Sequence, residues 1–238
     1  MNRARPWQIA RLLFRTHLPF LLLAWLGFAV FVAVVVAVIS LFRPITISGW
    51  DGASGVVRWA AAGYGAYLTG RLLPVFIAHG QTRRDFMIQT SVFAAVAVAA
   101  YAALATIGYA LEGLLYRAVD WPQRFQEDRI FTASDQVLPI FITHAVMLLG
   151  WMIAGAFLAA AFYRLDGGGL VAIPVAILLV ATASLAVGYN SLPFVGAFIQ
   201  RLDAPVIATA VLAAASILAG AGLTWGLVRD VPIKTRTS

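Results

Sequence analysis

The sequence predicts an all-α integral membrane protein with six transmembrane helices and an amphipathic interfacial helix at its N-terminal end. Of its 238 residues, 62% are hydrophobic and 11% are charged, whereas soluble domains are about half apolar and about one quarter charged. The chain also contains six long apolar runs. Each is close to the roughly 20 residues that a helix needs to cross a hydrocarbon core about 30 Å thick.

The six expected spans belong to one membrane domain, residues 1–238. In chain order they cover about 18–42, 56–78, 88–111, 137–162, 169–188 and 205–228. A cleaved signal peptide is the alternative for the first run, because cationic residues precede it. That run is longer than the apolar core of a signal peptide, which has about 7–15 residues, and five more runs follow it, so we expect it to be retained.

The segment before the first span, residues 6–17, has the pattern of a helix that lies in the membrane interface. Pro6 suits the first position of a helix. The apolar side has Trp7, Ala10, Phe14 and Leu18, and the polar side has Gln8, Arg11 and Arg15. This separation predicts an amphipathic helix along the inner leaflet, in contact with membrane lipids.

The basic residues predict the orientation. With the N-terminus inside, the inner segments hold ten Lys and Arg against three Asp, and the outer segments hold six Arg against seven acidic residues. Positive charge concentrates on the cytoplasmic side of membrane proteins. We therefore expect a multi-pass protein of the cell membrane with both termini in the cytoplasm. The net charge of +7 then faces lipid headgroups or a cytoplasmic protein, and no nucleic acid is expected.

The stretch HGQTRRDFM, His79 to Met87, lies between the second and third spans, on the inner side. Thr82 followed by Asp85 is the pattern of a helix N-cap. Arg83 and Arg84 then stand at the positive end of that helix, where each costs about 0.3–1 kcal/mol. They either hold the orientation by binding lipid phosphate or bind a protein partner.

This segment resembles an element of the permease subunits of the ABC transporter type 2 family. The matching residues are Gly80, Gln81, Thr82, Arg83, Arg84, Asp85 and Phe86. The resemblance implies a coupling helix that docks on a separate ATPase subunit, where ATP and magnesium bind, and an exporter formed with a second permease chain, identical or similar. It also implies a lesser ATPase contact at Arg164 and Asp166. The residues of this segment by themselves predict a plain turn.

Two outer segments stand out. Residues 190–205 are too short to span and too apolar for an exposed loop, so they form either a re-entrant hairpin, broken at Pro193 and Gly196, or a segment lying on the membrane surface. In the hairpin, Phe194 and Phe198 would form an outer gate. Residues 112–136 are polar and are expected to be a solvated cap with surface ion pairs, or less simply a dock for a substrate or partner.

Polar residues within the spans are candidates for function. Tyr64, Tyr67 and Arg71 share a helical face at α-helical spacing and form either the lining of a translocation path or an interhelical hydrogen-bonded seam. His144 is expected to be a satisfied structural histidine. The small-residue pairs Ala61/Gly65 and Gly222/Gly226 predict close helix packing.

Several classes of protein are disfavoured. The chain has no cysteine, and its one lysine, Lys234, belongs to no phosphate-binding loop. No protease or hydrolase motif occurs, so we expect no enzymatic activity and no bound cofactor or metal in this chain. The spans lack acidic residues, which disfavours an ion-coupled carrier. The favoured hypothesis is an ABC exporter subunit that moves an amphipathic molecule. The alternative is a non-transporting membrane anchor or regulatory subunit.

Overall fold

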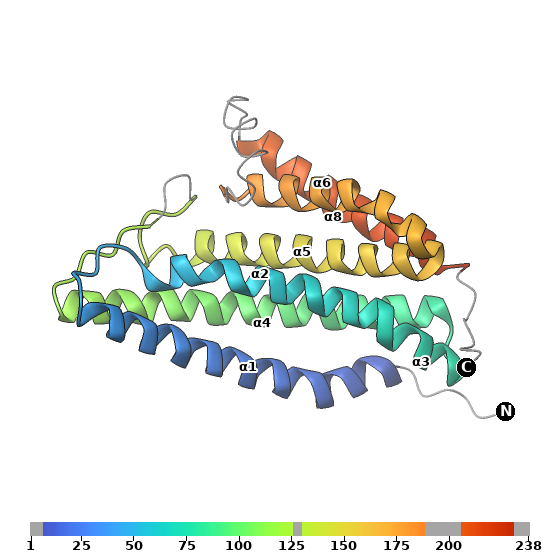
Figure 1. The fold of residues 1–238 in the computed structure, drawn as a ribbon, viewed down its shortest axis with the longest axis horizontal. Helices are drawn as coiled ribbons and strands as arrows, with labels where there is room; N and C mark the ends of the chain where they lie inside the picture. Colours follow the sequence, from blue (N-terminus) through green and yellow to red (C-terminus); the bar gives the residue numbers. More distant parts are fainter. Residues whose placement is uncertain (1–6, 126–129, 189–205, 231–238) are drawn as a thin grey trace.

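The computed structural model describes residues 7–125, 130–188 and 206–230, and in these ranges helices joined by loops make up the chain. The helices lie side by side with their axes roughly along one direction (Figure 1). In chain order they are α1 (Gln8–Ser40), α2 (Gly49–Tyr67), the π-helix η1 (Leu68–Leu72), α3 (Leu73–Ala78), α4 (Arg83–Ala118), α5 (Val137–Leu165), the 3-10 helix η2 (Asp166–Val171), α6 (Ala172–Leu185) and α8 (Val206–Val228).

Within the described ranges, four helical segments are long and apolar enough to cross a membrane, as expected of a membrane protein. They are Gln8–Ser40, Arg83–Ala118, Val137–Leu185 and Ala210–Val228. The third contains α5, η2 and α6, and the chain reverses direction at η2 (Figure 1). The second expected span, 56–78, corresponds to α2, η1 and α3 together.

The expected interfacial helix, residues 6–17, is not separate from the first span. α1 runs without interruption for 33 residues, through Pro19. Its first turns are buried against the protein at Ile9, Ala10 and Leu13. The apolar side of this segment therefore packs on the helix bundle, which the amphipathic pattern could not distinguish from packing on lipid.

A π-helix interrupts the second expected span because of Pro74. Proline has no N–H and its ring clashes with the carbonyl four residues earlier, here Gly70. The chain accommodates this by widening the preceding turn, in which the Leu73 N–H donates to the Leu68 carbonyl. A widened turn changes the rotation of the residues that follow it, about the helix axis, relative to the residues that precede it.

α5 is the central helix of the bundle. It packs against α2, α4, α6 and α8, whereas α1 lies mainly on α4 and touches α2 much less. The buried core accordingly runs along α5 and the inward faces of α2 and α4, with Phe93, Met147 and Trp151 among its members. α1 is the outermost helix on its side of the bundle (Figure 1).

α2 and α5 touch through their backbones at two glycines. A Cβ atom on Gly65 would lie 1.9 Å from the Met152 carbonyl oxygen, and one on Gly155 would lie 1.9 Å from the Ala62 carbonyl oxygen. The expected close approach at Gly65 is therefore confirmed, and its partner is within the same chain. Gly222 and Gly226 differ, because a Cβ on either would meet no atom within 4 Å.

The segments that carry the inner basic excess meet at one end of the bundle. The start of α1, the α3–α4 connection, the turn at η2 and the end of α8 lie together there (Figure 1). The loop after α1 and the segment after α4 lie at the opposite end. The described segments that the charge pattern assigns to the inner side thus lie at one end of the bundle.

The α2–α5 contact predicts how the protein responds to one added methyl group. Gly65→Ala places a methyl against backbone that cannot move aside, and we expect it to cost about 3 kcal/mol. Thermal unfolding of the purified protein in detergent measures the effect as a clear fall in Tm. Gly63→Ala is the matched control, since Gly63 lies on the same helix and a Cβ there meets nothing within 4 Å. An equal Tm for the two variants would contradict the packing.

Candidate functional site

The connection between α3 and α4, residues 79–85, is a sharp turn that we call the elbow. Gly80 adopts a left-handed backbone with φ of 81°, a conformation that glycine adopts without strain. The Gly80 N–H donates to the Ile77 carbonyl at 2.9 Å, and the Gln81 N–H donates to the Phe76 carbonyl at 3.0 Å. These two bonds form the Schellman motif, which closes α3 and satisfies its last carbonyls.

The other side of the elbow is capped as the sequence predicts. Thr82 has an extended backbone and is the N-cap of α4, and its Oγ1 accepts a hydrogen bond from the Asp85 N–H at 3.0 Å. The Thr82 hydroxyl in turn donates to the Asp85 carboxylate at 2.7 Å. The elbow is therefore closed by local hydrogen bonds on both sides, so its shape depends little on the rest of the chain.

The elbow presents a polar surface at the end of the bundle. His79, Gly80, Thr82, Arg84 and Asp85 are exposed, and Gln81 and Arg83 are half-buried. Phe86 is different, and its expected place among the docking residues is wrong. Its side chain is buried in the core, where its ring lies 5.7 Å from that of Phe76. Phe86 anchors the elbow to the bundle, because burying its ring in the core removes apolar surface from water, which is favourable in free energy.

The first turns of α4 also hold the start of α1. The Gln89 side-chain oxygen accepts hydrogen bonds from the backbone N–H groups of Ile9 and Ala10, at 2.9 and 3.1 Å. One turn further along α4, Phe93 packs edge-on against Phe14 with ring centroids 5.2 Å apart. A displacement of the elbow would therefore reach α1 through α4. Gln89 escaped the sequence analysis, since its partner lies about 80 residues away.

The predicted residues of the N-terminal segment separate as their pattern requires, with one exception. Phe14 packs inward, and Arg11 and Arg15 are exposed. Trp7 belongs to the predicted apolar side but is 46% exposed, at a left-handed position that begins α1. Its ring thus lies where it can contact a lipid surface or a partner.

Arg164 and Asp166 lie at the same end as the elbow, but Arg164 has a contact within the chain. Its Nη1 donates to the carbonyls of Gly226 and Leu227, both at 3.1 Å, which caps the last turn of α8. A cation at the negative end of a helix is stabilising. Asp166 is exposed and has a positive φ of 47° where α5 ends. Arg164 thus holds α8 to the end of α5.

Tyr64 and Tyr67 form a polar cluster with His17 of α1, and Arg71 does not join them. The Tyr64 hydroxyl is 2.9 Å from His17 Nδ1, and the Tyr67 ring is 5.8 Å from the histidine ring. Arg71 lies within the π-helix and is exposed, and it does not line the cavity beside the cluster. The π turn interrupts the α-helical spacing on which the predicted face of Tyr64, Tyr67 and Arg71 depended.

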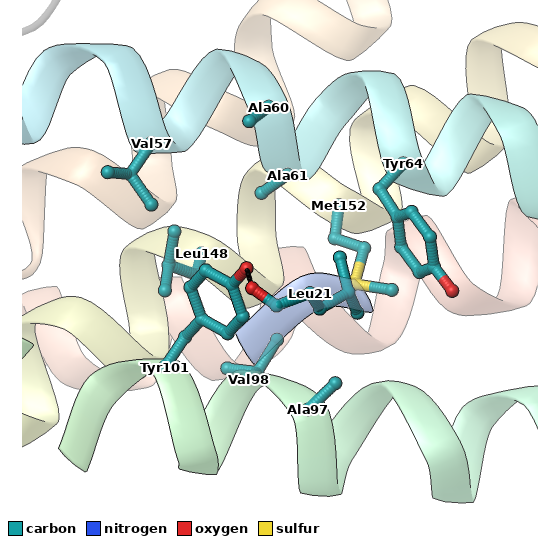
Figure 2. A pocket seen from close by; sticks show the side chains of 10 residues that line it. All are labelled: Leu21, Val57, Ala60, Ala61, Tyr64, Ala97, Val98, Tyr101, Leu148 and Met152. Atoms are coloured by element: carbon teal, nitrogen blue, oxygen red, sulfur yellow. Dashed lines mark hydrogen bonds between the residues drawn. The ribbon is translucent and has the colours of Figure 1, made fainter. Parts of the chain in front are cut away.

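A groove runs along the seam between α1 and α2, and three cavities open along it. The polar cavity, of about 400 Å³, is lined by Thr16, His17, Phe20, Tyr64 and Tyr67. The apolar cavity, of about 70 Å³, follows it and shares Tyr64. In Figure 2, Ala61 of α2 and Ala97 of α4 face each other across the apolar cavity, and the Tyr101 hydroxyl donates to the Leu21 carbonyl. The outer cavity, of about 410 Å³, lies at the opposite end, beside Arg43, Ser48 and Tyr116.

Stacked aromatic rings, which we call the aromatic stack, separate the inner cavities from the outer cavity. Trp25 of α1 stacks on Trp50 of α2 with centroids 5.7 Å apart, and Phe28 packs edge-on against Trp50 at 5.8 Å. The space they enclose is about 20 Å³. Trp50 fits there because Gly108 of α4 leaves room, and a Cβ on that glycine would lie 2.7 Å from the Trp50 ring. The groove is therefore constricted by large apolar side chains.

The start of α2 is held by a buried carboxylate, contrary to expectation. Glu112 begins the segment expected to be a solvated cap, yet it is 6% exposed. Its oxygens accept hydrogen bonds from the N–H groups of Gly49 and Trp50 at 2.7 and 3.1 Å, from the Ser48 hydroxyl and from Gln123. A helix N-terminus favours an anion in this way. Phe131 of the same segment is also buried, against Tyr109.

Two further polar residues lie within the bundle. His144 is buried, and its Nδ1 donates to the Ile140 carbonyl at 2.8 Å, as expected of a satisfied structural histidine. Arg58 lies near the start of the second expected span, and its guanidinium lies over the Trp151 ring of α5, 5.4 Å from the centroid, where a cation–π contact stabilises it. The expected outer gate, Phe194 and Phe198, and the proposed break at Pro193 and Gly196 lie outside the described residues.

The arrangement of these residues favours binding and mechanical coupling. Among the described residues, no three His, Cys, Asp or Glu side chains gather as they would around a metal ion. The described side chains instead form two features that are joined through α4. These are an exposed elbow with a defined shape and a groove between α1 and α2.

The Glu112 contacts predict a stability effect at the outer end of the bundle. Glu112→Ala leaves two backbone N–H groups and the Gln123 amide without their acceptor. We expect the free energy of unfolding to fall by about 3 kcal/mol, since hydrogen bonds to a charged group contribute about 1.5–3 kcal/mol each. Thermal unfolding in detergent provides the measurement. Glu112→Gln, which keeps one acceptor oxygen, should lose less, and a loss as large as that of alanine would argue against the hydrogen bonds as the cause.

Comparison with known proteins identifies no relative. No protein-family model matches the chain, and no curated protein or solved structure matches it significantly. The elbow, the groove and their connection through α4 are therefore the basis on which a function can be assigned.

Proposed function

We propose that this chain is the transmembrane subunit of an ATP-driven exporter of the ABC type, coupled through its elbow to a separate ATPase subunit. One observation carries the proposal. The elbow is a polar turn, capped on both sides, that stays exposed at the basic end of the bundle. Two arginines alone would be enough to hold the orientation of the chain in the membrane. A segment that docks on another protein also needs a defined shape.

In this proposal the chain crosses the membrane six times. The crossings are α1, the unit of α2, η1 and α3, then α4, α5, α6 and α8. Both termini are cytoplasmic, and the elbow, Arg164 and Asp166 lie on the same side. The basic side chains that gather at this end follow the positive-inside bias.

The contacts of α4 support a path by which force would reach the groove. Binding of ATP and magnesium by the partner would close the ATPase and push on the elbow. Phe86 and Gln89 connect the elbow to α3 and α1. α1 lies mainly on α4 and only lightly on α2, so a tilt of α4 would widen or narrow the groove. The π-helix below Tyr67 supplies a deformable point in the other wall.

A second copy or a similar permease chain would complete the transporter, and the cargo would be an amphipathic molecule suited to the apolar walls of the groove. A membrane anchor without transport would share the elbow. It would have no need of the constricted groove, and it would not show ATP hydrolysis that responds to a cargo.

Charge reversal at the elbow tests the coupling. Arg83→Glu combined with Arg84→Glu should leave membrane insertion intact and abolish co-purification of a P-loop ATPase from the native host. The bound ATPase is identified by mass spectrometry and by ATP hydrolysis in the eluate. Arg117→Glu combined with Arg124→Glu makes the same charge change at the opposite end and should retain the ATPase. Equal retention by both variants would refute a docking role for the elbow.

The orientation can be tested directly, because the chain has no cysteine of its own. His79→Cys in the elbow should react with a membrane-impermeant maleimide only after the cells are permeabilised. Asp120→Cys, in the turn after α4, should react in intact cells. Labelling of the elbow from outside would overturn both the orientation and the coupling proposal.

A further inference from the structure

We propose that the outer cavity between α1 and α2 binds one phospholipid of the surrounding membrane, with an acyl chain in the cavity and the phosphate on Arg43. This site is separate from the elbow. The proposal depends on α1 crossing the membrane and does not depend on an ATPase partner.

The outer cavity is large enough for an acyl chain. Its volume of about 410 Å³ is more than twice the roughly 150 Å³ of an apolar cavity that holds benzene. Apolar side chains of α1 line it from Phe28 to Ile39, and these two residues lie about 16 Å apart along the helix. The cavity is therefore long as well as apolar, which suits an extended chain better than a compact ring system.

The cavity has a buried part and an open part, as a site for one chain of a two-chain lipid requires. Of its lining residues, Val32 and Tyr116 are buried, whereas Phe31 and Val56 are mostly exposed. A chain can therefore enter from the bilayer without separation of the helices. The second chain of the same lipid would remain in the bilayer.

The polar groups of the cavity lie at its outer end. Arg43, Thr46 and Ser48 belong to the segment between α1 and α2. Among the described residues, no acidic side chain lines the cavity, and the Arg43 guanidinium has no hydrogen bond or ion pair. Glu112 does not line it, because its oxygens are bound by the N-terminus of α2. A guanidinium with all its donors available matches a phosphate group, which it can bind through two parallel hydrogen bonds.

Arg43 lies at the depth at which phosphate groups are found. α1 has 33 residues and is about 50 Å long, which exceeds the roughly 40–45 Å thickness of a bilayer with its head groups. A crossing helix of this length has both ends among the head groups, and Arg43 follows α1 by three residues. From there the cavity extends toward the middle of α1, where Phe28 belongs both to it and to the aromatic stack. Phosphate and chain thus take the order that they have in the bilayer.

The test uses the full chain in phosphatidylcholine nanodiscs. The probe is phosphatidylcholine with a diazirine at the end of one acyl chain, and cross-linked residues are mapped by mass spectrometry. Any lipid labels the exposed face of α1, so labelling is normalised to that face. We expect additional labelling at Val32, which is buried and lines the cavity.

Filling the cavity should remove this additional labelling. Gly52 lines the cavity, and a Cβ there would meet nothing within 4 Å. Gly52→Phe should therefore reduce labelling of Val32 at least tenfold, and Gly52→Leu is a smaller filling substitution. Gly63→Phe is the matched control, since Gly63 has the same free space on α2 but lines none of the cavities along the groove, and it should leave the labelling unchanged.

A second probe tests the role of Arg43. Diacylglycerol with the same labelled chain has no phosphate, and it should label Val32 at least fivefold less than the phospholipid probe. Arg43→Gln should remove this difference, and Arg43→Lys, which keeps the charge, should retain most of it. Arg117→Gln removes another exposed arginine at the outer end of the bundle and should leave the difference unchanged.

Three results would overturn the site. The first is wild-type labelling of Val32 in a Gly52 variant whose Tm shows that it is folded. The second is a phospholipid preference that survives Arg43→Gln. The third is a lack of Val32 labelling in the wild-type chain, as expected if a second copy of the chain covers the cavity. Because ATPase co-purification is measured separately, its loss would not affect these results.

Discussion

The backbone contact between α2 and α5 sets the geometry on which the groove depends. Gly65 and Gly155 let the two helices approach until the chain of one touches the chain of the other. α2 is thereby drawn toward α5, and α1, which lies on α4, is left with few contacts to α2. The cavities of the groove lie along this less closely packed seam.

Polar contacts fix the two ends of this seam, and apolar contacts fill its middle. At the basic end, Gln89 holds the start of α1 on α4. At the opposite end, Glu112 holds the start of α2 on the same helix. α4 therefore holds one end of each wall of the groove, although α2 packs mainly against α5. The elbow leads into the first turn of α4, so a displacement of the elbow would reach both walls of the groove.

Local features of the chain could be predicted from sequence because their partners are near in sequence. The Thr82 cap depends on Asp85, three residues away. Features that depend on a distant partner could not be predicted. Phe86 faces the core, Arg164 holds the end of α8, and Glu112 is buried. A polar or aromatic residue can face either way on a helix until its neighbour is known.

The sequence by itself determined the helical membrane class, the separation of charge between the two ends and the Thr82 cap at the start of α4. Hydrophobicity, charge and helix capping depend on residues within one or two helical turns of each other, so they can be inferred from the order of the residues along the chain. Tertiary structure alone decided that His17 joins Tyr64, that a π turn lies between Tyr67 and Leu73, and that Trp25 meets Trp50. These outcomes depend on how helices distant in sequence pack together.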